Sequence, residues 1–250
     1  MVGIGPGNYE GMTLRAIQAL EESDVIAGYT VYCDLVRDRF PDKDYIVTAM
    51  TGEEKRVEMA LDAAEEGKTV SLVCSGDPGV YGMAGLAISK AAARSAGPRP
   101  AGPGCDRVEV EVIPGVTAAL SGAALLGAPL IHDFCVISLS DRLTPMELIE
   151  KRLRLAAEAD LGIVIYNPES RSRKGYLSGA CDILAEKIEP GRVCGIVRNI
   201  GREGESTQVM TFGELREAKA DMFSTVFIGN SGTGNVQGSM VTIRGYKSEV

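Results

Sequence analysis

Three glycine- and proline-rich bends are the parts of this chain whose residue types and spacing best suit ligand binding through main-chain groups. They read Gly3-Ile-Gly-Pro-Gly7, Ser75-Gly-Asp-Pro-Gly-Val-Tyr-Gly82 and Ile113-Pro-Gly-Val-Thr-Ala118. Glycine leaves backbone amides and carbonyls accessible, and Asp77 adds an acceptor or a negative charge. One such bend is as typical of an ordinary loop as of a binding site. Three bends that each follow a strand indicate a ligand at the carboxyl edge of one α/β sheet.

A second group of residues has the chemistry to move protons. His132 is the only histidine of the chain and stands beside Asp133, and an imidazole can act as acid or base near neutral pH. Asp141 follows the predicted strand end Ser138-Leu-Ser140. A hydrogen-bonded hinge histidine and two turn or capping aspartates would explain the same residues, so both interpretations stay open.

Arginines follow several predicted strand ends in the second half of the chain. They include Arg171, Arg173 and Arg198. Their guanidinium groups match planar carboxylates in a bidentate geometry, which indicates a substrate that carries carboxylates. The alternative is a solvated basic loop.

The composition describes an ordinary globular protein. The chain has 250 residues, of which 45% are hydrophobic and 24% charged, and a net charge of −8. An acidic balance argues against bulk nucleic-acid binding, which leaves a basic footprint. It does not exclude an acidic small molecule, because a local arginine cluster can oppose the global sign.

The cysteines and the histidine do not predict a metal site. The six cysteines contain no C-x-x-C pair, and most of them fall in apolar runs, where they are expected to be small buried hydrophobes of a reducing compartment. Residues 112–131 carry no charge, but proline and glycine interrupt them. A strand end followed by a buried helix is therefore favoured over a membrane span, and a cytoplasmic protein is expected.

Strands and helices alternate through the first half, which predicts an α/β fold with a mostly parallel N-terminal sheet. A domain boundary is expected between residues 130 and 131, giving domains 1–130 and 131–250, the second with a mixed sheet. The alternation of Val and Glu over 108–113 predicts a half-exposed strand. Helix starts are expected at Thr13, at Thr51 with a capping box to Glu54, and at Thr144 with Pro145 in the first helical position.

A nucleotide cofactor is disfavoured. The first bend matches a dinucleotide fingerprint only loosely, because Asn8 stands where G-x-G-x-x-G needs glycine. The second predicted strand ends at Ala27-Gly28 without an acidic ribose ligand, and no P-loop is present.

The three bends, in their order and approximate spacing, resemble the tetrapyrrole (corrin/porphyrin) methylase family over essentially the whole chain. The resemblance implies two α/β domains, usually in a homodimer, with S-adenosylmethionine in a cleft between the domains. Carried over position by position, it implies cofactor contacts from Pro6, Gly76, Asp77, Val80, Thr117, Ala118, Asn167 and Gly201. Many family members have methionine at the position of Asn167, and the first strand of this chain is unusually short.

Motifs of the second half narrow the resemblance. Pro129-Leu-Ile-His-Asp-Phe134 and Tyr166-Asn-Pro-Glu-Ser-Arg-Ser-Arg173 are similar to the branch of the family that methylates C-17 of a cobalamin precursor. The resemblance implies precorrin-3B or cobalt-factor III as substrate, with contraction of the ring. Catalytic roles for His132, Asp133 and Asp141, and substrate contacts from Arg171, Arg173 and Arg198, are expected on this basis. The alternatives are another family activity, such as methylation elsewhere on the ring or diphthine synthesis, and a non-catalytic tetrapyrrole-binding module.

Overall fold

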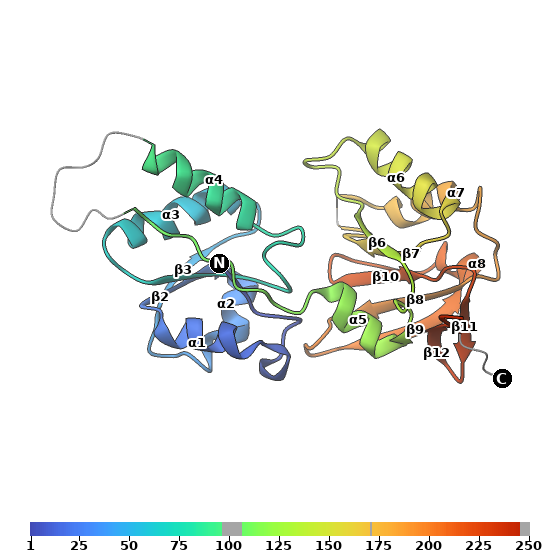
Figure 1. The fold of residues 1–250 in the computed structure, drawn as a ribbon, viewed down its shortest axis with the longest axis horizontal. Helices are drawn as coiled ribbons and strands as arrows, with labels where there is room; N and C mark the ends of the chain where they lie inside the picture. The colour runs from blue at the N-terminus through green and yellow to red at the C-terminus, as the bar shows by residue number, and fades with distance from the viewer. Residues whose placement is uncertain (97–106, 171, 246–250) are drawn as a thin grey trace. The chain divides into compact units, whose positions relative to one another are not determined.

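The computed structural model describes residues 1–96, 107–170 and 172–245, and the chain divides into two compact units, Met1–Thr117 and Ala118–Val250 (Figure 1). The boundary expected from the sequence, at 130/131, lies further along the chain. Helix α5 (Ala118–Leu126) accounts for the difference. Its Ala119 and Leu126 pack in one hydrophobic core with Phe227 of unit 2, so the helix belongs to that unit.

Unit 1 is a parallel sheet with helices on both faces. Its elements are β1 (Val2–Gly3), α1 (Leu14–Glu22), β2 (Val25–Tyr29), α2 (Thr30–Arg37), β3 (Asp44–Thr48), α3 (Glu53–Glu65), β4 (Val70–Cys74) and α4 (Ala84–Ser95), with a short 3-10 turn at Tyr9–Gly11. The described strands pair in the order β1-β4-β2-β3, each pair parallel, which confirms the predicted parallel sheet. Strand β3 was not recognised in the sequence.

Alternating residues of these strands contribute to two hydrophobic cores, one on each face of the sheet. On one face Ile26 and Val73 pack with residues of α1 and α2, and on the other Ala27 and Leu72 pack with α3 and α4 (Figure 1). The period-2 alternation of side chains along a strand is what separates the two cores.

Residues 108–113 do not form the strand expected from their Val/Glu alternation. Only Ile113 bridges to the sheet, parallel to Val2, while residues 108–112 have no regular secondary structure. Glu111 instead accepts a hydrogen bond from the N-terminal ammonium through its carbonyl, at 2.8 Å. Because β1 is only two residues long, it offers too little edge to pair a full strand.

One of three predicted helix caps is present. The Thr13 side chain accepts a hydrogen bond from the Ala16 amide at 3.1 Å, as expected. The prediction of a capping box at Thr51 is wrong, because Thr51 has a left-handed φ of 69° and Gly52 is the N-cap. The start at Thr144 is one residue too early, since Pro145 has an extended ψ of 140° and is itself the N-cap.

Unit 2 carries a mixed sheet, also with cover on both faces. Besides α5, its elements are β5 (Gly127–Ala128), β6 (Phe134–Ser138), α6 (Met146–Glu158), β7 (Gly162–Tyr166), α7 (Tyr176–Leu184), β8 (Val193–Arg198), β9 (Ser206–Thr211), α8 (Phe212–Leu215), β10 (Ser224–Ile228), β11 (Thr233–Val236) and β12 (Ser239–Thr242). Five of the described strands pair in the order β6-β7-β10-β8-β9, with only β6 and β7 parallel. The predicted mixed sheet is confirmed, and a smaller sheet, β11-β12-β5, adds two strands that were not predicted, β5 and β11.

The large sheet separates two cores of unit 2. Helices α6, α7 and α8 cover one face, where Leu153 and Leu177 pack on Ile165. Helix α5 and Met240 of β12 cover the other face around Phe227. Strand β10 lies in the middle of the sheet and all five of its residues are buried.

The described residues contain no helix of the length and apolarity needed to cross a bilayer, and no cluster of potential metal ligands. The uncharged segment 112–131 contributes the nine-residue helix α5. The described cysteines are free thiols, four of them buried, and burial raises the pKa of Cys33 to about 11. Cys105 lies outside the described residues.

Candidate active site

The three glycine-rich bends lie together at the carboxyl edge of the unit 1 sheet, as predicted. Gly5 and Gly76 exchange backbone hydrogen bonds of 3.2 and 2.7 Å, which joins the first bend to the second. The Gly3 amide donates to the Ile113 carbonyl at 3.0 Å, which joins the first bend to the third. The main chain itself therefore fixes the relative positions of the bends.

Glycine is required where the bends touch. A Cβ atom on Gly3 would lie 2.6 Å from the Gly115 nitrogen and 2.7 Å from the Gly76 carbonyl oxygen. A Cβ atom on Gly115 would collide with the same carbonyl. No side chain fits between these backbones, because the obstructing atoms belong to the main chain and cannot rotate away.

Asp77 ties the second bend to the third. Its Oδ1 atom accepts from the Gly79 amide at 2.7 Å, and its Oδ2 atom accepts from the Gly115 amide at 3.1 Å. The carboxylate thus holds the loop geometry, and each oxygen keeps a second lone pair for a ligand. The family resemblance implies a cofactor contact for Asp77, whereas its bridge from Gly79 to Gly115 has no signal in the local sequence.

The bends offer polar main chain and apolar side chains together. Gly79 and Gly82 are exposed, Pro6 and Val80 are half-buried, and the Tyr81 side chain is 57% exposed with a left-handed φ of 52°. These residues fit a small ligand with an amino-acid or nucleoside part, which needs main-chain partners beside an apolar surface. Thr117, the last residue of unit 1, is also half-buried.

Arg56 brings a buried positive charge to the same edge of unit 1 and was not singled out in the sequence. The side chain comes from α3, and the residue is 3% exposed. Its guanidinium donates to Thr48 Oγ1 at 2.7 Å, to the Ala49 carbonyl at 3.0 Å and toward Met83 Sδ at 3.3 Å. It forms no ion pair with any described carboxylate. The arginine links the end of β3 to the start of α4, directly after the second bend.

Unit 2 presents a second carboxyl edge. Strand β10 is antiparallel to both β7 and β8, so β6, β7 and β8 run in the same direction and end at the same edge. Val226 of β10 pairs with Ile165 and with Ile196, so β7 and β8 end at nearly the same level, roughly 10 Å apart across β10. Asn167 follows the end of β7, and Arg198 is the last residue of β8.

Asn167 lies in a fixed position at this edge. It has a left-handed φ of 52°, and its Nδ2 donates to Ser138 Oγ at 3.0 Å. Gly201 follows β8 in the same region with a φ of 66°, and its amide donates to Glu205 at 2.7 Å. Both residues predicted to contact the cofactor from unit 2 strand ends therefore lie at one edge of the sheet.

Tyr166 connects this edge to the start of α5. Its hydroxyl oxygen accepts a hydrogen bond from the Ala119 amide at 2.6 Å. Ala118, predicted to contact the cofactor, is the first residue of that helix, and Asn167 follows Tyr166 in the chain. In the sequence, Tyr166 stands out only as the first residue of the Tyr166–Arg173 motif. An aromatic residue directly before a polar turn was the available signal.

Asp141 and Arg173 also lie near the ends of β6 and β7. Tyr176, at the start of α7, donates its hydroxyl to Asp141 Oδ2 at 2.9 Å. The Arg173 Nε atom is buried and has no hydrogen-bond partner in the described chain. Arg171 lies outside the described residues.

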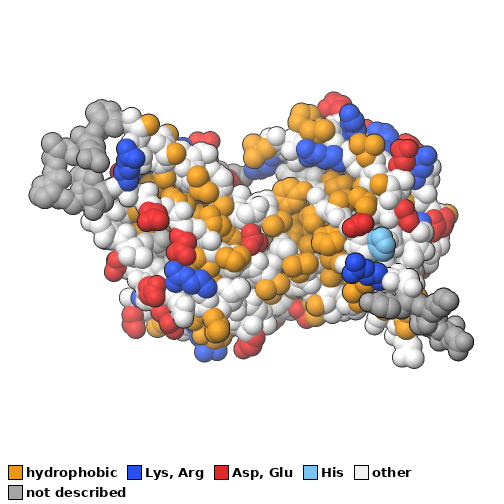
Figure 2. Space-filling model, in the orientation of Figure 1, with side chains coloured by type: hydrophobic (Ala, Val, Ile, Leu, Met, Phe, Trp, Pro, Cys, Tyr) orange, Lys and Arg blue, Asp and Glu red, His pale blue; other side chains and the backbone are white. Residues whose placement is uncertain are grey.

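His132 and Asp133 lie at the opposite edge of the sheet from Asp141. They precede β6, whereas Asp141 follows it, and five residues of strand span about 17 Å. The His132 Nδ1 atom accepts from the Asp133 amide at 2.9 Å, and both side chains are exposed (Figure 2, pale blue). The structure therefore does not bring the three predicted catalytic residues to one place.

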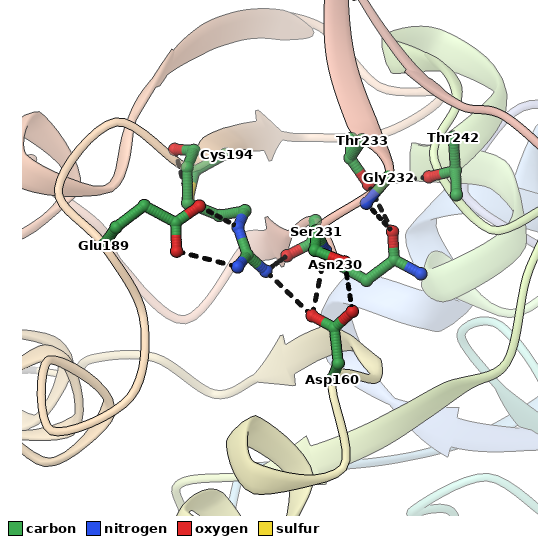
Figure 3. A network of polar contacts seen from close by, with 10 residues as sticks. Asp160, Glu189, Cys194, Asn230, Ser231, Gly232, Thr233 and Thr242 are labelled. Carbon is green, nitrogen blue, oxygen red and sulfur yellow. Dashed lines mark hydrogen bonds and ion pairs between the residues drawn. The ribbon is translucent and has the colours of Figure 1, made fainter.

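A polar network on that opposite edge has a structural role. Arg192, 9% exposed, donates to Glu189 at 2.6 and 2.8 Å, to Asp160 at 3.2 Å and to the Gly229 carbonyl at 3.1 Å (Figure 3). Ser231 donates to both Asp160 oxygens. The network fixes the loop after β10 against the start of β7, and its polar groups use one another as partners.

The fold and the bends match known proteins. The model of the family "Tetrapyrrole (Corrin/Porphyrin) Methylases" matches residues 1–216. The chain belongs to this family. It is 43% identical over 246 residues to a probable cobalt-factor III C(17)-methyltransferase of Salmonella typhimurium, covering 98% of each protein. It is 40% identical to a precorrin-3B C(17)-methyltransferase of Sinorhizobium sp, covering 95% of this chain and 90% of that protein.

A solved structure agrees with this assignment. The crystal structure of the methyltransferase CobJ superposes with a TM-score of 0.85 at 37% identity, over 97% of this chain and 98% of that one. The family resemblance predicted from the bends is thereby confirmed, as is the predicted enzyme class, a methyltransferase.

Proposed function

We propose that this tetrapyrrole methylase transfers a methyl group from S-adenosylmethionine to C-17 of precorrin-3B or cobalt-factor III in cobalamin biosynthesis, with contraction of the ring. The observation that carries the proposal is a match to C(17)-methyltransferases over nearly the full length of both chains, at 43% and 40% identity. The ring contraction rests on the resemblance of the sequence motifs alone.

The bends of unit 1 are proposed to hold the methyl donor. Main-chain groups around Gly76 and Val80 would bind its polar parts, with Pro6 and Thr117 beside them. Ala118, Asn167 and Gly201 of unit 2 are proposed as further contacts. The donor, when bound, supplies an electrophilic methyl group on a sulfonium. Methyl transfer is an in-line displacement, so the protein contributes mainly by orienting the acceptor carbon and excluding water.

The arginines of unit 2 are proposed to bind the acidic side chains of the macrocycle. Arg198 is the last residue of β8, at the edge of the sheet where β7 also ends, and no described carboxylate forms an ion pair with its guanidinium. Arg173 has a buried Nε that lacks a partner among the described residues. An unsatisfied buried donor costs about 1–3 kcal/mol, which a ligand carboxylate would recover.

The deciding experiment is anaerobic incubation with S-adenosylmethionine and either metal-free precorrin-3B or cobalt-factor III, read by mass spectrometry and absorption. A gain of one methyl group with one of them supports the proposal and identifies the substrate. Release of C-20 in the same product would support ring contraction. Absence of methylation of both, with the donor bound, would overturn the assignment to C-17.

A homodimer in the cytoplasm is proposed on the family resemblance. Light scattering on the purified chain tests the dimer, and a monomeric mass at assay concentration would contradict it. Fractionation of cells that express the tagged chain tests the compartment.

A further inference from the structure

The loop that joins β6 to α6, residues 141–144, has the composition of a surface for a flat, acidic ring. Leu143 is 99% exposed, and Arg142 beside it is exposed as well. A single exposed leucine is ordinary on a protein surface. This one stands next to a cation, in a loop that follows the carboxyl end of β6. A tetrapyrrole offers the complementary chemistry, an apolar ring face bordered by carboxylates.

The loop is held by few polar contacts. Tyr176 donates its hydroxyl to Asp141 Oδ2 at 2.9 Å, and the Ser140 amide donates to Ser138 Oγ at 3.2 Å. The Arg142 guanidinium forms no hydrogen bond or ion pair with any described residue, and the apolar Leu143 side chain is almost fully exposed. In Figure 1 the connection stands out from unit 2 beside α6.

The base of the loop borders a cavity. A cavity of about 210 Å³ lies between α6 and α7. Leu139, before the loop, and Met146, after it, both line this cavity, and so does Tyr176. Leu139 is also part of the buried core of unit 2, and Met146 packs against that core, so the two ends of the loop are anchored. Between them, the hydrogen bond from Tyr176 to Asp141 ties the loop to α7.

We propose that the β6–α6 loop is a substrate-binding element in which Leu143 packs on the ring face and Arg142 binds a carboxylate. Asp141 and Tyr176 position this loop, and neither one transfers a proton to substrate. The assignment replaces the catalytic role predicted for Asp141, and it rests on the proposed function, which supplies the macrocycle.

Electrostatics agree with a neutral tyrosine in this position. The hydrogen bond to Asp141 raises the pKa of the Tyr176 phenol, and the nearby charge of Arg173 acts in the opposite direction. The phenol stays protonated throughout the neutral range and remains a donor. The buried Arg173 Nε beside the pair is directed at no described acceptor, which leaves it for a second substrate carboxylate.

Substitutions of Asp141 separate a positioning role from a catalytic one. Asp141→Asn keeps an oxygen that accepts from Tyr176, whereas Asp141→Ala does not. If Asp141 positions the loop, kcat should change less than about threefold in Asp141→Asn. KM should rise about tenfold in both Asp141→Ala and Tyr176→Phe. If Asp141 is instead a general acid or base, kcat should fall about 10²–10⁴-fold in Asp141→Asn, and this result would overturn the positioning role.

Substitutions in the loop test the contact with the ring. Leu143→Asp should weaken binding of cobalt-factor III or precorrin-3B, followed by absorption titration, by about tenfold or more, with unchanged affinity for S-adenosylhomocysteine. Leu155→Asp is the matched control, because Leu155 is also an exposed leucine of unit 2, on α6. Arg142→Ala, compared with Arg152→Ala on α6, tests the carboxylate contact in the same way. Equal macrocycle affinity for Leu143→Asp and the wild type would overturn the proposal.

The titration also separates this proposal from the proposed function. If the wild-type protein binds the macrocycle without methylating it, the C-17 assignment fails, and the loop is still judged by affinity. If neither macrocycle binds, both proposals fail.

Discussion

Asp77 shows, at the scale of a residue, how one carboxylate can preserve the shape of a binding edge. It accepts hydrogen bonds from the amides of Gly79 and Gly115, which belong to different bends. The glycines nearby pack backbone on backbone, so a shift of one bend moves the next. A ligand that binds through main-chain groups needs these groups preorganised.

We predict that Asp77→Ala weakens binding of S-adenosylhomocysteine by about tenfold or more, measured by calorimetry. The substitution leaves two amide donors without their acceptor, at a cost of about 1–3 kcal/mol each where they are buried. Asp34→Ala on α2 is the control, since Asp34 forms an exposed ion pair with Arg37 in the same unit. Unchanged affinity in Asp77→Ala would exclude the residue from the site.

Tyr166 acts at the scale of the element. Tyr166 is the last residue of β7, and its hydroxyl oxygen accepts a hydrogen bond from the Ala119 amide in the first turn of α5. A helix leaves its first amides without internal partners, so such an acceptor fixes where the helix begins. The tyrosine thus couples the end of β7, with Asn167, to the start of α5, with Ala118.

We predict that Tyr166→Phe raises the dissociation constant of S-adenosylhomocysteine about fivefold, because the start of α5 loses a hydrogen bond worth about 1 kcal/mol. Tyr45→Phe in unit 1 is the matched control. It removes a hydroxyl that donates to the Phe40 carbonyl at 3.0 Å. It should lower the melting temperature comparably and leave affinity intact. Equal affinity losses in the two variants would indicate a general effect on stability.

The Arg192 network predicts a dependence of stability on pH. Hydrogen bonds from Arg192 lower the pKa of Glu189. Partial burial alone would raise the pKa of Asp160, but hydrogen bonds from Ser231 and the charge of Arg192 outweigh it, and the pKa is lowered. A carboxyl group whose pKa is lower in the folded than in the unfolded protein stabilises the fold at pH values above its unfolded pKa of about 4. This stabilisation is lost as the pH falls through the pKa of the folded state.

We therefore predict that Arg192→Met lowers the free energy of unfolding by about 2 kcal/mol at pH 7 and flattens the fall in urea midpoint as the pH drops below about 4. Arg216→Met is the control, since Arg216 pairs with Asp182 on the exposed surface, where solvent screens the ion pair. A steep acid limb that persists in Arg192→Met would assign the pH dependence to other carboxylates.

The same elements show what the sequence could and could not predict. Local chemistry revealed the bends, because glycine and proline mark them directly. The bridge from Asp77 to Gly115 and the hydrogen bonds of Tyr166 and Tyr176 join residues far apart in the chain, so no local pattern signals them. His132 and Asp141 flank one strand, and only the strand's direction shows that they reach opposite edges.

At the scale of the whole molecule, the net charge of −8 opposes the approach of a polycarboxylate, while the arginines of unit 2 attract it at short range. The two effects respond differently to salt. The Debye length falls from about 30 Å at 0.01 M to about 10 Å at 0.1 M, which screens the long-range repulsion. Direct contacts between arginine and carboxylate are screened less, because they exclude solvent.

We predict that kcat/KM for the macrocycle rises about two- to threefold between 0.01 and 0.1 M salt, because association with a like-charged protein is slowed at low ionic strength. Arg173→Ala should lower kcat/KM at both salt concentrations and keep the rise, since it removes a local contact and makes the net charge more negative. A fall of kcat/KM with salt in the wild type would mean that the local arginine field, rather than the net charge, governs the approach of the substrate.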